Sequence, residues 1–201
     1  MSPVNAHRTR HQPGNDEGFT LIELLVVLLI IGILLAIAIP TFLGVTKSAN
    51  NTAAQSNLQT ALTGAKAYFT SNTQSFANIE TSTRVPSIEG IDTGLSYVTA
   101  ATGSSGPHVV SVKVGPTATT GSWVVLEAWS SGTQDCWGIL DVTASPAAGS
   151  FVDGITSSTQ VGTYFFVRTK ATTANLCRAA TALSAKLVPP NRQSQTGFPQ
   201  G

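Results

Sequence analysis

GFTLIELLVVLLIIGILLAIAIP, residues 18 to 40, is the most informative stretch of this 201-residue chain. From Leu24 to Ile39 it contains no polar side chain. A helix from Phe19 to Ile39 is roughly 31 Å long, which matches the thickness of a bilayer's hydrocarbon core. Helices on the surface of soluble proteins carry one apolar stripe, whereas this one is apolar on every side. We therefore expect it to lie in a membrane or among similar helices.

Glu23 is the charged exception in this helix. An acidic side chain at the centre of a membrane helix costs roughly 2.5–3.5 kcal/mol, and less near an end. The helix offers no basic neighbour, so we expect the partner of Glu23 to come from elsewhere. A new α-amino group, made by cutting the chain before Phe19, would be a suitable cation.

The string Gly18-Phe19-Thr20-Leu21-Ile22-Glu23 before a long apolar helix resembles the class III signal of type IV pilins and pseudopilins. The resemblance is specific over the apolar segment and fades by about Phe69. It implies that a prepilin peptidase cuts between Gly18 and Phe19 and methylates the new amine of Phe19. It also implies that Glu23 pairs with the amine of a neighbouring subunit. The implied partners are other pilin subunits, the prepilin peptidase and an assembly platform in the membrane.

Two other interpretations of the N-terminal region remain open. An ordinary signal anchor has an apolar run but does not need the residues around Gly18. A secretory signal peptide is favoured by the A-x-A pattern Ala36-Ile37-Ala38, and cleavage after Ala38 would release a secreted binding module. The apolar run is longer than the ~7–15 residues usual for such a peptide.

The leader that the resemblance implies is residues 1–18. Arg8 and Arg10 precede the apolar span and favour a cytoplasmic N-terminus. Asp16 and Glu17 stand where many family members place a basic residue, so the leader departs from the family pattern there.

We expect one long helix over residues 19–71, of which 19–40 are the transmembrane segment or filament core. Leu58, Leu62, Ala65 and Phe69 follow the i, i+4, i+7, i+11 spacing of one helix face. Pro40 removes a backbone hydrogen bond, which predicts a bend near residues 36–40.

Residues 72–187 are expected to form a β-rich globular head. Apolar alternation and turn residues predict strands over residues 95–100, 109–114, 122–130, 136–143 and 163–169. Val110, Val112 and Val114 would point inward, with Ser111 and Lys113 outward. Residues 171–186 fit a short helix or an edge strand, and residues 188–201 a disordered tail. The fold class is therefore α+β, with the long helix packed on an antiparallel sheet as in type IV pilins.

Composition limits the classes of partner. The net charge is +1, only 10% of residues are charged, and no run of basic residues occurs, so nucleic-acid binding is not indicated. The abundant Ser, Thr, Gly and Ala suit the neutral surface of an extracellular fibre subunit.

The two cysteines, Cys136 and Cys177, both lie in the expected head. In an exported domain they would form a disulfide, and two free buried thiols are the alternative. Many pilins tie the C-terminal part of the head with such a bridge, so the resemblance supports the pairing.

No residue pattern points to catalysis. His108 lies in a turn-like stretch, the glycines near Gly103 lack the lysine of a phosphate loop, and no spacing of ligands predicts a metal site. We therefore expect no enzymatic activity, no cofactor and no bound metal.

The interpretation that joins these observations is a structural subunit of a type IV pilus. It would be a single-pass membrane protein before assembly and part of an extracellular filament afterwards. The alternative is a pseudopilin or minor pilin of a type II-secretion-like or DNA-uptake machine.

Overall fold

The computed structural model describes residues 18–79, 88, 90, 94–116, 120–144, 161–169, 177–182, 192–194 and 197–198. The expected leader therefore lies outside the described residues, apart from Gly18. The chain divides into two compact units, Met1–Phe42 and Leu43–Gly201.

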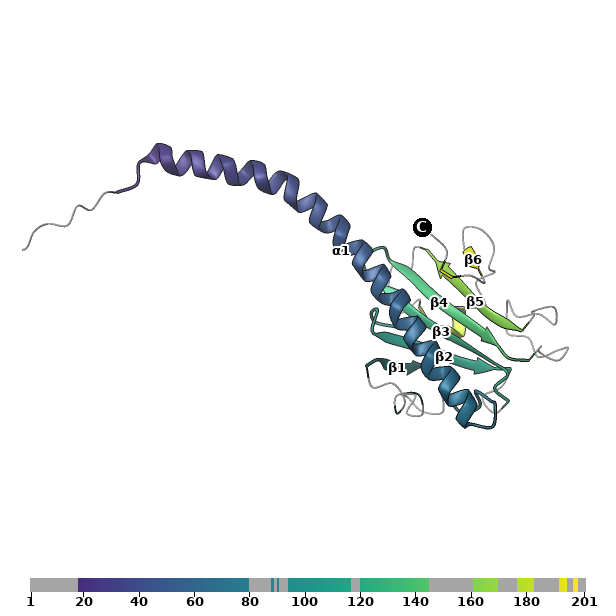
Figure 1. Ribbon diagram of the computed structural model, residues 1–201. Helices are drawn as coiled ribbons and strands as arrows, with labels where there is room; N and C mark the ends of the chain where they lie inside the picture. The colour runs from purple at the N-terminus through teal and green to yellow at the C-terminus, as the bar shows by residue number, and fades with distance from the viewer. Residues whose placement is uncertain are drawn as a thin grey trace, which may run out of the picture. The chain divides into compact units, whose positions relative to one another are not determined.

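One helix dominates the N-terminal part of the chain. Helix α1 extends from Leu21 to Ser71 and confirms the long helix expected from the sequence (Figure 1). Its C-terminal part buries small and apolar residues on one face: Ala54, Leu58, Ala61, Gly64 and Ala65. These positions repeat with the period of a helix, so one face of this half is apolar and packs against a surface, as the apolar spacing in the sequence predicted.

The head contains a six-stranded sheet with the order β1-β2-β3-β4-β5-β6. The strands are β1 Ser96–Thr99, β2 Val109–Gly115, β3 Trp123–Ser130, β4 Asp135–Val142, β5 Gly162–Arg168 and β6 Arg192–Ser194. Neighbouring strands from β2 to β5 are antiparallel, as expected, and β6, which was not expected, also pairs antiparallel with β5. The pair β1–β2 is parallel, which corrects the expectation of a wholly antiparallel sheet. The α+β class is confirmed.

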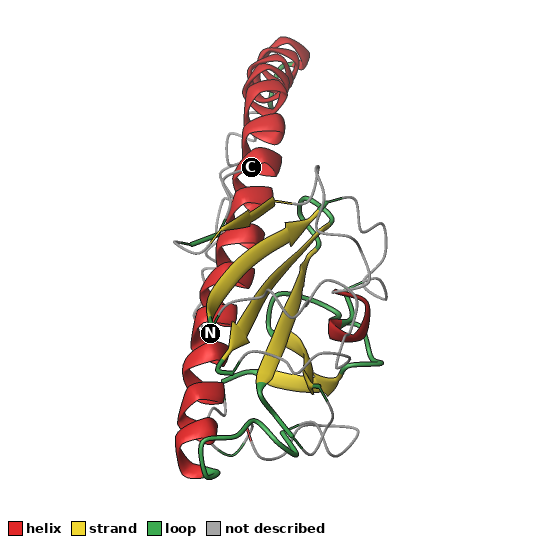
Figure 2. Cartoon of the chain, turned by 90° about the vertical axis from the view of Figure 1, so that its right-hand side faces the viewer, coloured by secondary structure: helices red, strands yellow, loops and turns green. Residues whose placement is uncertain are grey.

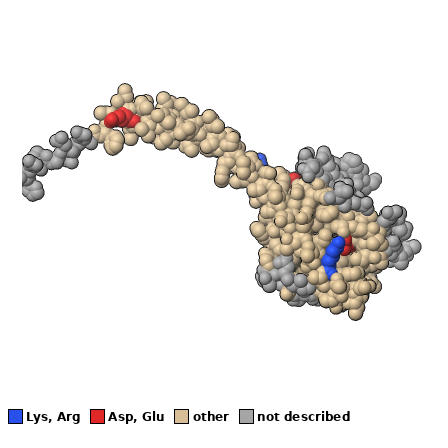
Figure 3. All heavy atoms as spheres, viewed as in Figure 1, with Lys and Arg blue, Asp and Glu red and all other residues tan. Residues whose placement is uncertain are grey.

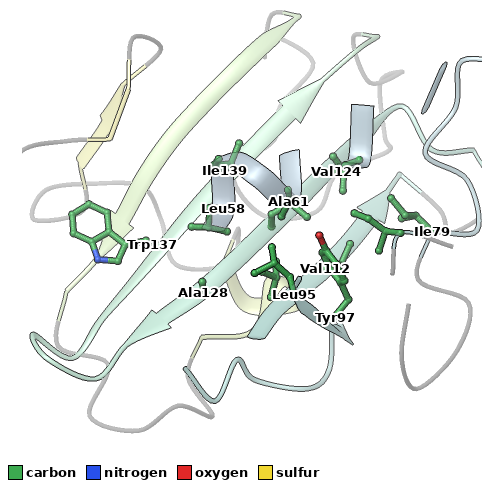
Figure 4. Close-up of a cluster of buried hydrophobic side chains, with 14 of the residues drawn as sticks. Leu58, Ala61, Ile79, Leu95, Tyr97, Val112, Val124, Ala128, Trp137 and Ile139 are labelled. Atoms are coloured by element: carbon green, nitrogen blue, oxygen red, sulfur yellow. The ribbon is translucent and has the colours of Figure 1, made fainter. Parts of the chain in front are cut away.

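The main core lies between α1 and one face of the sheet, as Figures 2 and 4 show. Leu58 and Ala61 of α1 meet alternate residues of the strands, which point to the same face. The buried strand residues of this face are Tyr97, Val110, Val112, Val114, Val124, Leu126, Ala128, Trp137, Ile139 and Val167. The inward direction expected for the valines of β2 is therefore confirmed.

The opposite face of the sheet is also covered. The short helix α3, Ala179–Ala182, lies on the side of the sheet away from α1 (Figure 2). A second cluster buries Trp123, Val125, Leu140, Val142, Phe166 and Ala179. Ser111 points to this face but is buried, and its hydroxyl accepts the amide of Ala179 at 3.0 Å. Residues that point away from α1 are therefore not exposed to solvent here, because a second layer covers that face of the sheet.

A charged pair lies inside this second layer. Glu127 of β3 is fully buried and pairs with Arg168 at the end of β5. Nε and Nη2 of Arg168 both donate to Oε1 of Glu127, while Oε2 has no hydrogen-bond partner among the described residues. Burial raises the pKa of Glu127 to about 7, and the charge of Arg168 only partly opposes this effect.

The C-terminal region departs from the expected disorder at two places. Arg192–Ser194 form β6 and pair with β5. The ring of Phe198 lies 5.0 Å from that of Phe165 and 5.6 Å from that of Trp137, between centroids and with edge-on geometry. These aromatic contacts close the β5 side of the core, so part of the tail belongs to the head. The other residues of 188–201 lie outside the described part of the chain.

Candidate assembly segment

The helix α1 begins with a local hydrogen-bonded cap. Thr20 precedes the first helical residue, and Glu23 occupies the third position of the first turn. Oε2 of Glu23 accepts the backbone N–H of Thr20 at 2.9 Å and its hydroxyl at 2.8 Å. The N–H of Glu23 in turn donates to the hydroxyl oxygen of Thr20 at 3.3 Å. This reciprocal arrangement is a capping box.

The capping box changes the interpretation of Glu23. The sequence-based expectation considered only cations as partners and missed Thr20, although a Thr followed three residues later by Glu is a readable signal. The box satisfies backbone donors that the first turn of a helix leaves unpaired. Within the described residues the box uses only Oε2, which leaves Oε1 for a second donor.

The apolar half of α1 has no covering partner within the described part of the chain. Phe19 is 89% exposed, and an 18-residue stretch of α1 with a mean hydropathy of 3.2 has none of its residues buried. By length and composition this stretch is sufficient to cross a membrane. At about 25 cal/mol per Å² of apolar surface, leaving such a helix in water would be strongly unfavourable. Its sequence therefore requires lipid or other helices around it.

Gly18 has open space around it. A Cβ added to Gly18 would meet no atom within 4 Å. The described fold therefore does not require glycine at this position. A requirement for glycine would have to come from a molecule that recognises the segment.

Pro40 lies inside α1, which stays helical on both sides of it. A proline has no N–H to donate to the carbonyl four residues earlier. The hydroxyl of Thr41 donates to the carbonyls of Ile37 at 3.0 Å and Ala38 at 2.9 Å, and so supplies polar contacts beside the gap. The bend itself stays a prediction.

The two cysteines form a disulfide. Cys136 and Cys177 are bonded, with their Cα atoms 5.3 Å apart, and both are fully buried beside Trp129. Since Cys136 belongs to β4 and Cys177 precedes α3, the bond ties the second layer to the sheet.

Charged groups are sparse on the face that Figure 3 presents, where uncharged residues predominate. Within the described ranges, no group of three or more His, Cys, Asp and Glu residues could hold a metal ion. His108 lies beside α1, with its Nδ1 2.9 Å from Nδ2 of Asn57. The described geometry of His108 is thus that of a loop contact.

Comparisons with known proteins identify the N-terminal segment. Residues 14–39 match the family model of the prokaryotic N-terminal methylation motif. The type IV major pilin protein PilA of Myxococcus xanthus (strain DK1622) is 46% identical to this chain over 61 residues, which cover 30% of this chain and 27% of the relative. No solved structure matches the chain. The resemblance seen from Gly18 to Glu23 is confirmed, and the chain is type IV pilin-like with a class III signal.

Proposed function

We propose that this chain is a structural subunit of a type IV pilus. A prepilin peptidase cuts the precursor between Gly18 and Phe19 and methylates the amine of Phe19. Residues 19–40 hold the precursor in the membrane and afterwards pack in the filament core. The role is mechanical and not enzymatic, and the filament is extracellular.

The observation that carries the proposal is the coincidence of three features in one segment. The methylation motif spans the Gly18–Phe19 bond. The described fold leaves the surroundings of Gly18 open and Phe19 exposed, so a peptidase can reach the bond. The helix that follows has an apolar surface that no described residue covers. Outside the bilayer, packing among neighbouring helices keeps that surface from water and so holds the filament together.

Glu23 sets the axial register of the filament in this proposal. The capping box fixes its carboxylate at the start of α1, where the helix dipole favours a negative charge. Oε1 can then accept the ammonium group of Phe19 from a neighbouring subunit. In an apolar filament core this pairing offsets the cost of burying both charges.

Three variants separate cleavage, capping and charge. Gly18→Glu should leave the precursor at its full mass. Glu23→Ala should be cut normally yet form few filaments, because it lacks both the cap and the charge. Glu23→Gln keeps an acceptor for Thr20 but no charge. The measurements are precursor size and the amount of filament sheared from cells.

The Gln variant decides the role of the charge. We expect it to assemble as poorly as Glu23→Ala. Normal filament yield from Glu23→Gln would contradict the register role and leave only the cap. Cleavage of Gly18→Glu at Phe19 would contradict the proposed recognition of glycine.

The same signal occurs in pseudopilins and minor pilins, so these remain the alternative within the pilin-like class. Subunit counting in purified filaments separates them. A major pilin forms nearly all of the filament mass, whereas a minor subunit is a trace component.

A further inference from the structure

The turn between β3 and β4 lies directly against the backbone of α1. A Cβ added to Gly132 in this turn would lie 2.7 Å from Cα of Lys47 and 2.8 Å from its carbonyl oxygen. Those distances are too short for any real side chain, so glycine allows the close approach. Gly132 therefore contacts the helix at Lys47, seven residues before Ala54, the first fully buried residue of α1.

Asn51, one turn further along α1, bonds this hairpin twice. Its Oδ1 accepts the hydroxyl of Thr133 at 2.7 Å and Nε1–H of Trp137 at 3.2 Å. An indole N–H can only donate, so the atom that faces Trp137 must be the amide oxygen. Trp137 is buried, with 3% of its surface exposed, and its N–H needs a partner. We name these contacts of Gly132, Thr133 and Trp137 with Lys47 and Asn51 the Asn51 clamp.

The part of α1 before the clamp is intrinsically weak. Pro40 interrupts the backbone hydrogen bonds of the helix. Gly44 is a poor helix former, and a Cβ added to it would meet no atom within 4 Å, so no packing requires glycine there. Leu43 and Val45 are 54% and 67% exposed, so little packing holds this part of the helix. The free energy of local opening should therefore be low before Lys47 and rise at the clamp.

We propose that Asn51 is a positioning residue that stops local opening of α1 at Lys47 and so keeps it from spreading into the head. The clamp acts through atoms of the β3–β4 hairpin that lie more than 80 residues away in sequence. The clamp therefore holds the part of α1 that packs on the head through contacts with the sheet, and these contacts are independent of hydrogen bonds within the helix.

The clamp has a consequence for assembly, and this consequence rests on the proposed function. A subunit that leaves a bilayer and packs in a filament changes the surroundings of residues 21–46. The clamp confines any loss of helix during that change to the segment before Lys47. The head would keep its fold throughout.

Hydrogen exchange on the full chain in detergent micelles tests the clamp itself. Asn51→Ala removes both hydrogen bonds, whereas Asn51→Asp keeps an oxygen acceptor for both donors. Asn50→Ala is the matched control, because it makes the same change in helix propensity without touching the bonds to Thr133 and Trp137. We expect exchange in residues 47–53 to be about tenfold faster in Asn51→Ala only. Exchange in residues 58–65 should stay unchanged.

Thr133→Val gives a second, milder test outside α1, with a smaller acceleration over the same residues. Equal exchange in Asn51→Ala and Asn50→Ala would overturn the clamp. A uniform acceleration that includes residues 58–65 would also overturn it, since that result means a global loss of stability. None of these outcomes depends on filament formation, so failure of the clamp and failure of the pilus proposal can be told apart.

Discussion

The two halves of α1 share one secondary structure but meet opposite surroundings. Between Leu21 and Ile39 the large apolar side chains are exposed, from 45% at Val26 to 81% at Leu21. Between Ala54 and Ala65 the face that meets the sheet is fully buried at Ala54, Leu58, Ala61 and Ala65, and Leu62 beside it is partly buried. The first half is apolar on every side because it needs partners beyond its own fold. The second is amphipathic because its partner is the head of the same chain.

The largest expected effect comes from removing a large apolar side chain in the second half of α1, with the same change in the first half as its control. Leu58→Ala should destabilise the head by about 2–5 kcal/mol, because Leu58 is fully buried in the core. Leu34→Ala should leave head stability unchanged, since Leu34 is 61% exposed. Denaturant unfolding in detergent, followed by tryptophan fluorescence, measures both. Equal losses would mean that the two halves are not stabilised separately.

The second prediction concerns pH and belongs to the head alone. The folded pKa of Glu127 is raised to about 7 from an ordinary value of 4.5, so the folded head binds a proton more tightly than the unfolded chain. The resulting stability is fully present below the ordinary pKa and is lost as pH rises through about 7. Lowering the pH from about 8 to about 5 should add on the order of 2 kcal/mol from this group.

Glu127→Gln is the control for that pH dependence. It keeps the shape of the side chain but cannot titrate, so its unfolding midpoint should change less over the same range. Parallel pH curves for the two proteins would show that Glu127 is not the responsible group.

The smallest effect is expected at the helix start. Thr20→Ala removes the capping box and should cost about 1 kcal/mol of local helix stability. Thr20→Ser keeps the hydroxyl and should restore the cap. Amide exchange of residues 21–24 in micelles reports the difference. The head should be insensitive to both changes, and a shift in head unfolding would argue against the separation of the two halves.

Prediction from the sequence succeeded where a local residue pattern is compatible with only one secondary structure. The period of Leu58, Leu62 and Ala65 requires a helix with a partner surface, and the alternation in β2 requires a strand. The short β-type runs of the head became β1 to β5 close to their expected bounds. The motif around Gly18 was specific enough to indicate the family.

Prediction from the sequence failed where contacts between distant parts of the chain decide the structure. The residues of β1 carry no signal for their direction, so the parallel pairing with β2 could not be predicted from them. Ser111 and Glu127 are polar, yet a second layer buries both. The contacts of Phe198 with Phe165 and Trp137 join distant parts of the chain and leave no local pattern. The capping box of Thr20 and Glu23, in contrast, was readable and missed.

The most direct test of pilin processing is the intact mass and N-terminal sequence of the protein in material sheared from the cell surface. We predict a chain that begins at Phe19 and carries one methyl group on its amine. A chain that begins at Ile39 would contradict this prediction, because that product is a secreted domain without the apolar helix. A chain that still begins at Met1 and occurs only in membranes would mean a plain signal anchor and would equally contradict it.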